Sequence, residues 1–224
     1  MGEIIRLTAA DGHEFDVWLA RPTGTPRGGL VLVQEIFGMT GQMQRCADRF
    51  AERGYLTVLP ALFDRVEPGL TVAYDDFATG GAAAQAVTEA QAMADCEASR
   101  RAVLDAGRTA IMGYCWGGTV AYQAAALLDF DCAVSYYGGG IGALVERLQP
   151  KVPVQYHFGA QDSFIPEAVI DQIREADPDG MFYVYESAGH GFNCDDRDSY
   201  DAVASQQSEE LVQAFLERHL AAGD

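Results

Sequence analysis

A cysteine between two glycines is the residue of this chain best suited to covalent chemistry. Residues 113–117 are Gly-Tyr-Cys-Trp-Gly, which is the form of a nucleophile elbow, G-x-S-x-G, with Cys115 in the serine position. An apolar run typical of a buried strand precedes the motif at 109–112, and small residues typical of a helix follow it. The start of a helix favours the thiolate form of a cysteine. The motif therefore predicts a thiol that attacks a carbonyl carbon.

An acid and a histidine follow Cys115 in the order that a hydrolytic triad uses. Asp162 comes just after a predicted strand at 152–158, and His190 lies between two glycines after a predicted strand at 181–185. Since all three residues follow strands, we expect them at the same edge of a sheet. His190 would then accept and return the proton, and Asp162 would hold the imidazole in one tautomer.

The other three histidines have simpler interpretations. His13 lies in a predicted hairpin turn, where we expect it in solvent, and His219 lies on the last predicted helix. His157 lies inside a predicted buried strand, which favours a hydrogen-bonded core histidine. His190 is thus the histidine without an evident packing role, and loops carry function more often than cores.

The end of the predicted strand at 30–35 supplies two further candidates. The backbone amide of Ile36, together with that of Trp116, is expected to form an oxyanion hole. Glu35 places a carboxylate at the end of an apolar strand, which is costly unless the charge is paired. Two interpretations remain open. Glu35 either forms a structural ion pair, with Arg65 or Arg108, or lies beside the Cys115 thiol and disfavours its ionisation.

The predicted elements alternate between strands and helices after an opening hairpin. Strands are expected at 4–8, 15–20, 30–35, 56–60, 109–112, 132–136, 152–158 and 181–185, and helices at 42–53, 82–104, 118–128, 167–175 and 202–220. Residues 61–80 are expected to form a long irregular connection. This order predicts an α/β fold, a mostly parallel central sheet flanked by helices. A chain of 224 residues favours a single domain, residues 1–224.

Composition excludes several classes of protein. A formal net charge of −18 argues against nucleic acid and anionic membranes as partners. There is no apolar run long enough for a membrane span and no signal-peptide core at the N-terminus, so we expect a cytoplasmic protein. The five cysteines are widely spaced, which argues against a disulfide framework or a cysteine zinc site. Three of them are expected to be small buried residues: Cys46, Cys96 and Cys132. We expect no metal and no cofactor.

Five motifs in order along the chain resemble the dienelactone hydrolase (carboxymethylenebutenolidase) family. They are Gln-Glu-Ile-Phe-Gly at 34–38, Gly-Tyr-Cys-Trp-Gly-Gly at 113–118, Tyr-Tyr-Gly at 136–138, Gly-Ala-Gln-Asp at 159–162 and Gly-His-Gly-Phe at 189–192. The resemblance implies an α/β-hydrolase fold with no large cap and a Cys-His-Asp triad. It also implies a glutamate that holds the resting thiol, a role that falls on Glu35.

The chain departs from this family in its arginines. Family members that act on dienelactone bind the substrate carboxylate with two arginines, one before the elbow and one four residues after the histidine. Here residues 71–97 contain no arginine, and Cys194 stands at the second position. Arg65 and Arg197 are the nearby substitutes, and with Tyr137 they are the candidate substrate-binding residues.

The sequence therefore predicts a cysteine-dependent hydrolase of a small lactone or ester, acting as a monomer or small homo-oligomer. A carboxylesterase or thioesterase of another specificity is the alternative among enzymes. A non-catalytic protein that senses oxidants through Cys115 is the alternative from another class. Such a sensor needs neither Asp162 nor His190.

Overall fold

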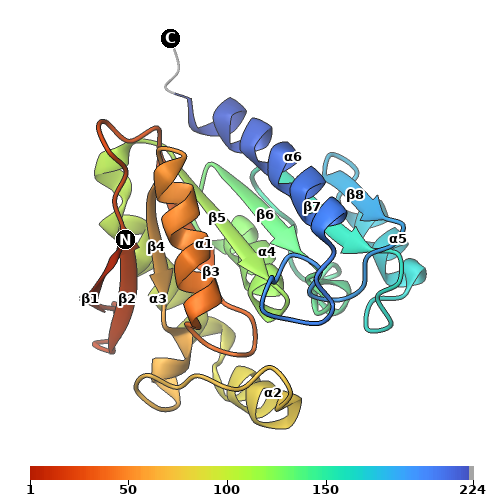
Figure 1. The fold of residues 1–224 in the computed structure, drawn as a ribbon, viewed down its shortest axis with the longest axis horizontal. Helices are drawn as coiled ribbons and strands as arrows, with labels where there is room; N and C mark the ends of the chain where they lie inside the picture. Colours follow the sequence, from red (N-terminus) through yellow and green to blue (C-terminus); the bar gives the residue numbers. More distant parts are fainter. Residues whose placement is uncertain (222–224) are drawn as a thin grey trace.

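The computed structural model describes residues 1–221, in which eight strands form one sheet (Figure 1). The strands are β1 (Glu3–Thr8), β2 (Glu14–Ala20), β3 (Gly29–Val33), β4 (Leu56–Pro60), β5 (Thr109–Tyr114), β6 (Cys132–Tyr136), β7 (Val154–Gly159) and β8 (Met181–Tyr185). Their order across the sheet is β1-β2-β4-β3-β5-β6-β7-β8. Strands β3 to β8 run parallel, while β2 pairs with β1 and β4 in the antiparallel sense. The predicted mostly parallel sheet is confirmed.

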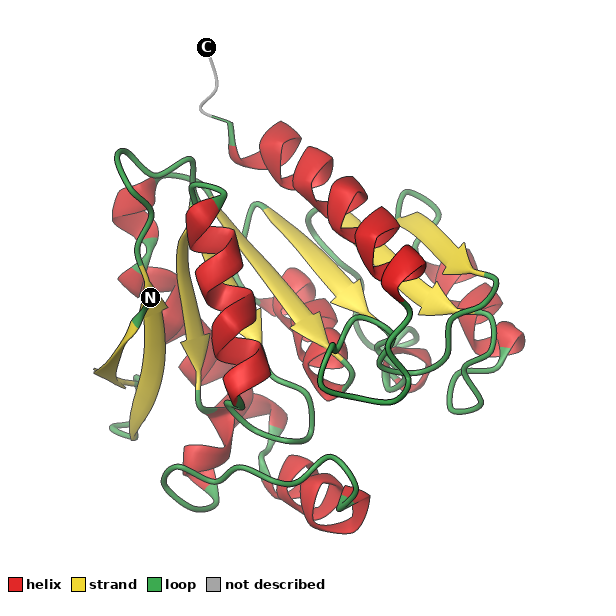
Figure 2. Ribbon diagram, in the orientation of Figure 1, coloured by secondary structure: helices red, strands yellow, loops and turns green. Residues whose placement is uncertain are grey.

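Helices cover both faces of the sheet. Figure 2 shows α1 (Gly41–Glu52) and α6 (Ala202–Leu220) on the near face and α3 (Glu89–Ala102) and α4 (Trp116–Leu127) behind it. The remaining helices are α2 (Phe77–Ala86) and α5 (Glu167–Ala176). Because both faces are covered, β3, β5 and β6 are buried along their whole length, which explains their continuous apolar runs. None of the helices described within residues 1–221 combines the length and apolarity that crossing a membrane requires.

Short polar side chains fix where two of these helices begin. The Thr40 hydroxyl accepts a hydrogen bond from the Met43 amide at the start of α1. The Asp201 carboxylate accepts bonds from the Val203 and Ala204 amides at the start of α6. Each cap satisfies amides that have no partner inside the helix. The second cap also ends the long loop that carries His190.

The structure differs from the sequence-based expectation between β4 and β5. The expected irregular stretch contains a 3-10 turn, Leu62–Arg65, and the first part of α2, and the expected helix at 82–104 is two helices. The break falls at Thr88, whose side chain accepts from the Gln91 amide while the Gln91 side chain accepts from the Thr88 amide. This capping box starts α3 afresh, a signal that the continuous run of small residues concealed.

The new helix α2 lies at the carboxyl ends of the parallel strands (Figure 1). Its Gly80 is packed so closely that a Cβ there would lie 2.4 Å from the Ile36 carbonyl oxygen. Only glycine permits that approach. The contact brings Phe77, the first residue of α2, to the edge of the sheet where Cys115, Asp162 and His190 are expected.

Candidate active site

Cys115 stands on a sharp turn between β5 and α4. Its backbone has φ 55° and ψ −117°, a left-handed conformation that costs energy for any residue other than glycine. The turn is held by two hydrogen bonds, from the Cys115 amide to the Tyr136 carbonyl (3.0 Å) and from the Gly118 amide to the Cys115 carbonyl (3.0 Å). A Cβ on Gly113 would lie 1.8 Å from the Gly117 carbonyl oxygen, so the turn requires glycine there. The strained turn lifts the thiol above the sheet edge.

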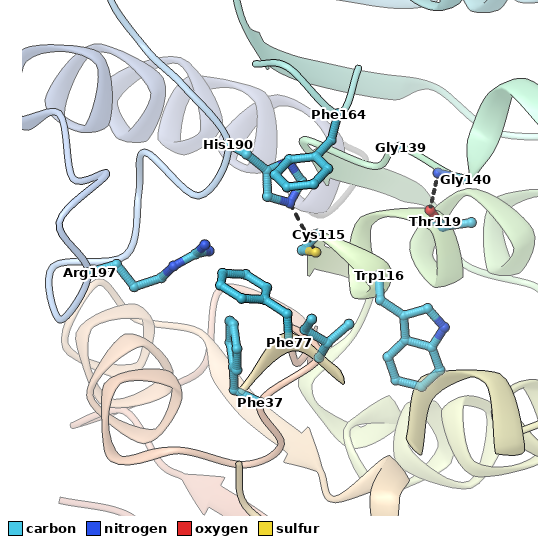
Figure 3. Close-up of a pocket in the computed structure, with 11 residues that line it drawn as sticks. Phe37, Phe77, Cys115, Trp116, Thr119, Gly139, Gly140, Phe164, His190 and Arg197 are labelled. Atoms are coloured by element: carbon cyan, nitrogen blue, oxygen red, sulfur yellow. Dashed lines mark hydrogen bonds between the residues drawn. The ribbon is translucent and has the colours of Figure 1, made fainter. Parts of the chain in front are cut away.

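The structure brings Cys115, His190 and Asp162 into one hydrogen-bonded line. His190 Nε2 lies 3.1 Å from Cys115 Sγ, and His190 Nδ1 lies 2.7 Å from Asp162 Oδ2 (Figure 3 shows the first contact). The second carboxylate oxygen, Asp162 Oδ1, accepts a hydrogen bond from the Phe164 amide at 2.8 Å. Asp162 is buried, and its position is fixed by these two contacts. Residues from three separate loops thus meet at one point.

The environment of His190 favours its protonated form. Burial lowers its pKa, but the hydrogen bonds to Asp162 and Cys115 outweigh burial and raise the pKa to about 10. His157 behaves in the opposite way: it is buried between Tyr185 and Gln155, and burial lowers its pKa to about 3. His157 is therefore a neutral core residue, as expected.

Glu35 is buried and pairs with Arg197, not with Arg65 or Arg108. Arg197 Nη1 lies 3.4 Å from Glu35 Oε2 and 3.5 Å from Oε1. Burial raises the pKa of Glu35, while Arg197, His190 and Tyr137 oppose that shift. Within residues 1–221, no hydrogen bond joins Glu35 to Cys115, whose sulfur contacts His190 instead. Glu35 is therefore the ion-pair partner of Arg197, and the Cys115 thiol contacts His190.

A cavity of about 310 Å³ opens over Cys115 (Figure 3). It is lined by Ile36, Phe37, Phe77, Cys115, Trp116, Thr119, Gly139, Gly140, Phe164, His190 and Arg197. Most of these side chains are apolar, and the guanidinium of Arg197 stacks over the rings of Phe37 and Phe77 at 5.2 and 5.8 Å. Among residues 1–221, the amides of Ile36 and Trp116 donate no hydrogen bond to a backbone carbonyl of the loops and turns.

The three candidate substrate-binding residues have different positions. Arg197 lines the cavity. Tyr137 is fully buried and does not line the cavity, which corrects the expectation that it contacts substrate; it has φ 38°, and its ring lies 5.1 Å from that of His190. Arg65 does not line the cavity. Its guanidinium is held by Asp95 and Asp11 at 2.6 Å each, so the structure corrects the expectation that it binds substrate.

Replacing Arg65 by methionine is expected to destabilise the protein by about 3–5 kcal/mol and to leave KM for esters unchanged. The Arg65 side chain is 6% exposed and that of Asp95 is fully buried, so the variant leaves a buried carboxylate without its partner. Urea unfolding measures the loss. The matched control is Arg101→Met, because Arg101 is 68% exposed in its pair with Glu97 and should change stability by less than about 1 kcal/mol. A raised KM in Arg65→Met would contradict the structural role.

The aromatic wall of the cavity leaves little trace in the sequence. Phe37 lies within the Gln-Glu-Ile-Phe-Gly motif, whereas Phe77 and Phe164 lie outside the five family motifs. One signal was present for Phe164, since a large apolar residue two positions after a candidate catalytic acid lies in a loop at the sheet edge. No such signal exists for Phe77. Its position at the cavity depends on helix α2, whose first part falls in a stretch that the sequence predicts to be irregular. In the described part of the chain, no group of three or more His, Cys, Asp or Glu side chains is arranged to hold a metal ion.

A parallel sheet with a sharp strand–turn–helix elbow at Cys115, and with Asp162 and His190 in loops after later strands, has the arrangement of an α/β-hydrolase fold. Comparison with known proteins agrees. The chain is 32% identical to a carboxymethylenebutenolidase of Pseudomonas putida, over 96% of this chain and 95% of the relative. The structure of "Putative Dienelactone Hydrolase from Klebsiella pneumoniae" is 28% identical, with a TM-score of 0.81, over 95% of this chain and 98% of that one.

A third similarity concerns the fold alone. A dienelactone hydrolase-like promiscuous phosphotriesterase from metagenomic libraries shares 17% identity and a TM-score of 0.79, over 97% of this chain and 98% of that one.

The family model named "Dienelactone hydrolase family" matches residues 15–220. The chain belongs to the dienelactone hydrolase family, and it is a hydrolase.

Proposed function

We propose that this protein hydrolyses small carboxylic esters or lactones through a thioester formed on Cys115, with His190 and Asp162 completing a catalytic triad. The observation that carries the proposal is the unbroken line of contacts from Sγ to imidazole to carboxylate, 3.1 and 2.7 Å long. A protein that only senses oxidants through Cys115 does not need the contact between His190 and Asp162. The kinship with carboxymethylenebutenolidases supports the ester or lactone as the bond that is cleaved.

The geometry suggests the following sequence of steps. The Cys115 thiolate attacks the carbonyl carbon, and the carbonyl oxygen becomes an oxyanion that accepts hydrogen bonds from the Ile36 and Trp116 amides. As the C–O bond breaks, imidazolium His190 gives its proton to the leaving alcohol oxygen. Neutral His190 then takes a proton from water, which attacks the thioester and releases the carboxylic acid. The thiolate and the imidazolium are restored.

The charge in the cavity bears on the choice of substrate. Arg197 is the only cationic guanidinium or ammonium group among the residues that line it, and Glu35 already neutralises that charge. A substrate carboxylate would have to take Arg197 from Glu35 and leave a buried carboxylate unpaired. Neutral esters should therefore be hydrolysed about as well as acidic ones.

A matched pair of lactones tests this part of the proposal. One carries a free carboxylate, and the other is the primary amide of the same acid, which is neutral and adds no second ester bond. We expect the two kcat/KM values to lie within about tenfold of each other, since a desolvated carboxylate–arginine contact would give a much larger ratio. A preference of several hundredfold for the acid, lost in Arg197→Met, would show that Arg197 binds substrate in spite of Glu35.

Replacing Glu35 by glutamine is expected to make Cys115 react with iodoacetamide about threefold or more faster at neutral pH. Glu35 pairs with Arg197, and Arg197 lines the same cavity as Cys115. Removing the carboxylate charge leaves the Arg197 cation without its counter-charge in the cavity, which favours a negatively charged sulfur. Alkylation rates measured from pH 5 to pH 9 on both proteins decide the matter. An unchanged profile would mean that Glu35 serves only to hold Arg197.

A further inference from the structure

Two phenylalanines stand exposed at the mouth of the cavity. Phe164 is 70% exposed and Phe77 is 48% exposed. An exposed phenyl ring adds little to the stability of the fold, because its apolar surface stays in water. They come from separate segments, the loop after β7 and the first residue of α2, and both line the space above Cys115 (Figure 3). Large apolar side chains that gather at an open cavity are typical of a ligand-binding surface.

Phe164 has a fixed relation to the reacting atoms. Its ring meets the His190 ring edge-on, with centroids 5.3 Å apart and an interplanar angle of 68°. Its backbone amide donates to Asp162 Oδ1 at 2.8 Å, which ties the residue to the triad from the other end. The exposed ring therefore lies beside the imidazole.

This position identifies the part of the substrate that Phe164 contacts. His190 Nε2 must reach the leaving oxygen to give it a proton, so the alcohol part of the ester lies on the His190 side of Cys115. The ring of Phe164 covers that side. The group attached to the leaving oxygen is thus the group that packs on Phe164.

Building on the proposed function, we propose that the preferred substrates are esters of alcohols that carry an aromatic ring, and that Phe164 is the residue that selects the ring. The carbonyl carbon is attacked by Cys115 as before, the C–O bond breaks, and the aromatic alcohol leaves with the proton from His190. Aromatic pairs gain from edge-to-face contact beyond the burial of apolar area. Because Glu35 already neutralises Arg197, charge adds little to the selection, which rests on the aromatic ring.

Three acetate esters with one common acyl group test the selection. Benzyl, cyclohexylmethyl and methyl acetate release alcohols of similar acidity and form the same acetyl-enzyme, so differences in kcat/KM report contacts of the alcohol part. For the wild type we expect benzyl acetate to exceed methyl acetate by about tenfold or more, and to exceed cyclohexylmethyl acetate as well.

Substituting Phe164→Ala should lower the benzyl-to-methyl ratio about tenfold, because the ring that supplies the contact is gone. Tyr200→Ala is the matched control, since Tyr200 is a 42% exposed aromatic residue that does not line the cavity, and its ratio should stay at the wild-type value. Equal rates for the benzyl and cyclohexylmethyl esters, or a ratio unchanged in Phe164→Ala, would overturn the inference. Methyl acetate turnover that depends on Cys115 but shows no benzyl preference would overturn this inference alone. If none of the three esters were hydrolysed, the proposed function would be overturned as well.

Discussion

Replacing Cys115 by alanine is expected to lower kcat/KM for ester hydrolysis by about 10⁴-fold or more. The thiolate forms the covalent bond on which both half-reactions depend, and no neighbouring side chain in the cavity supplies another nucleophile of comparable strength. The amides of Ile36 and Trp116 remain in the variant, so a small residual rate is expected from oxyanion binding. Initial rates with p-nitrophenyl acetate measure the loss.

The matched control for this variant is Cys132→Ala. Cys132 is a free, fully buried cysteine on β6 and should keep most of the activity, because its loss removes only packing volume. If Cys115→Ala retained more than about one hundredth of the wild-type rate, a different nucleophile, such as activated water, would have to replace the thiol in the mechanism.

Replacing Asp162 by asparagine is expected to lower kcat by about 10³- to 10⁴-fold. An amide cannot hold His190 with its proton on Nδ1 as a carboxylate does. The substitution also removes the negative charge that stabilises the imidazolium. The exposed carboxylate of Asp171, which pairs with Arg174 on α5, provides the control substitution Asp171→Asn. A normal kcat in Asp162→Asn would show that His190 needs no carboxylate to act.

The same variant should change the dependence of stability on pH. The pKa of His190 is raised from 6.5 to about 10, so protonated His190 stabilises the folded protein fully below pH 6.5, and this contribution is lost as pH rises to about 10. The hydrogen bond to Asp162 is the largest of the effects that raise the pKa of His190. Losing the carboxylate should therefore shift this pKa downward. We expect the fall in free energy of unfolding between pH 7 and pH 10 to be smaller in Asp162→Asn. Urea unfolding at several pH values tests it.

Local patterns were enough to predict most of the fold and the core of the site. The predicted strands at 132–136 and 181–185 and the helix at 202–220 match β6, β8 and α6. Apolar runs, glycines and caps act over a few residues and can be recognised in one sequence. The order of Cys115, Asp162 and His190 after strands was likewise enough to predict that the structure would bring them together, since parallel strands end at one edge of the sheet.

Contacts between distant segments could not be predicted in the same way. Arg197 lies three residues beyond the position at which the family's second arginine was expected, and only the path of the loop between β8 and α6 carries it to Glu35. The partner of Arg65 is Asp95, thirty positions away on α3. Both pairings depend on how loops and helices fold over the sheet, which leaves no signature in residue spacing.

Trapping the acyl-enzyme tests the central claim most directly. The wild-type protein is mixed with p-nitrophenyl acetate, quenched with acid within milliseconds to seconds, digested and analysed by mass spectrometry. We predict one acetyl group per chain on the peptide that contains Cys115, absent in Cys115→Ala, and longer-lived in Asp162→Asn, where deacylation is slow. Turnover with no acetyl group on Cys115 at any quench time, or with the acetyl group on another residue in the wild type, would contradict the mechanism.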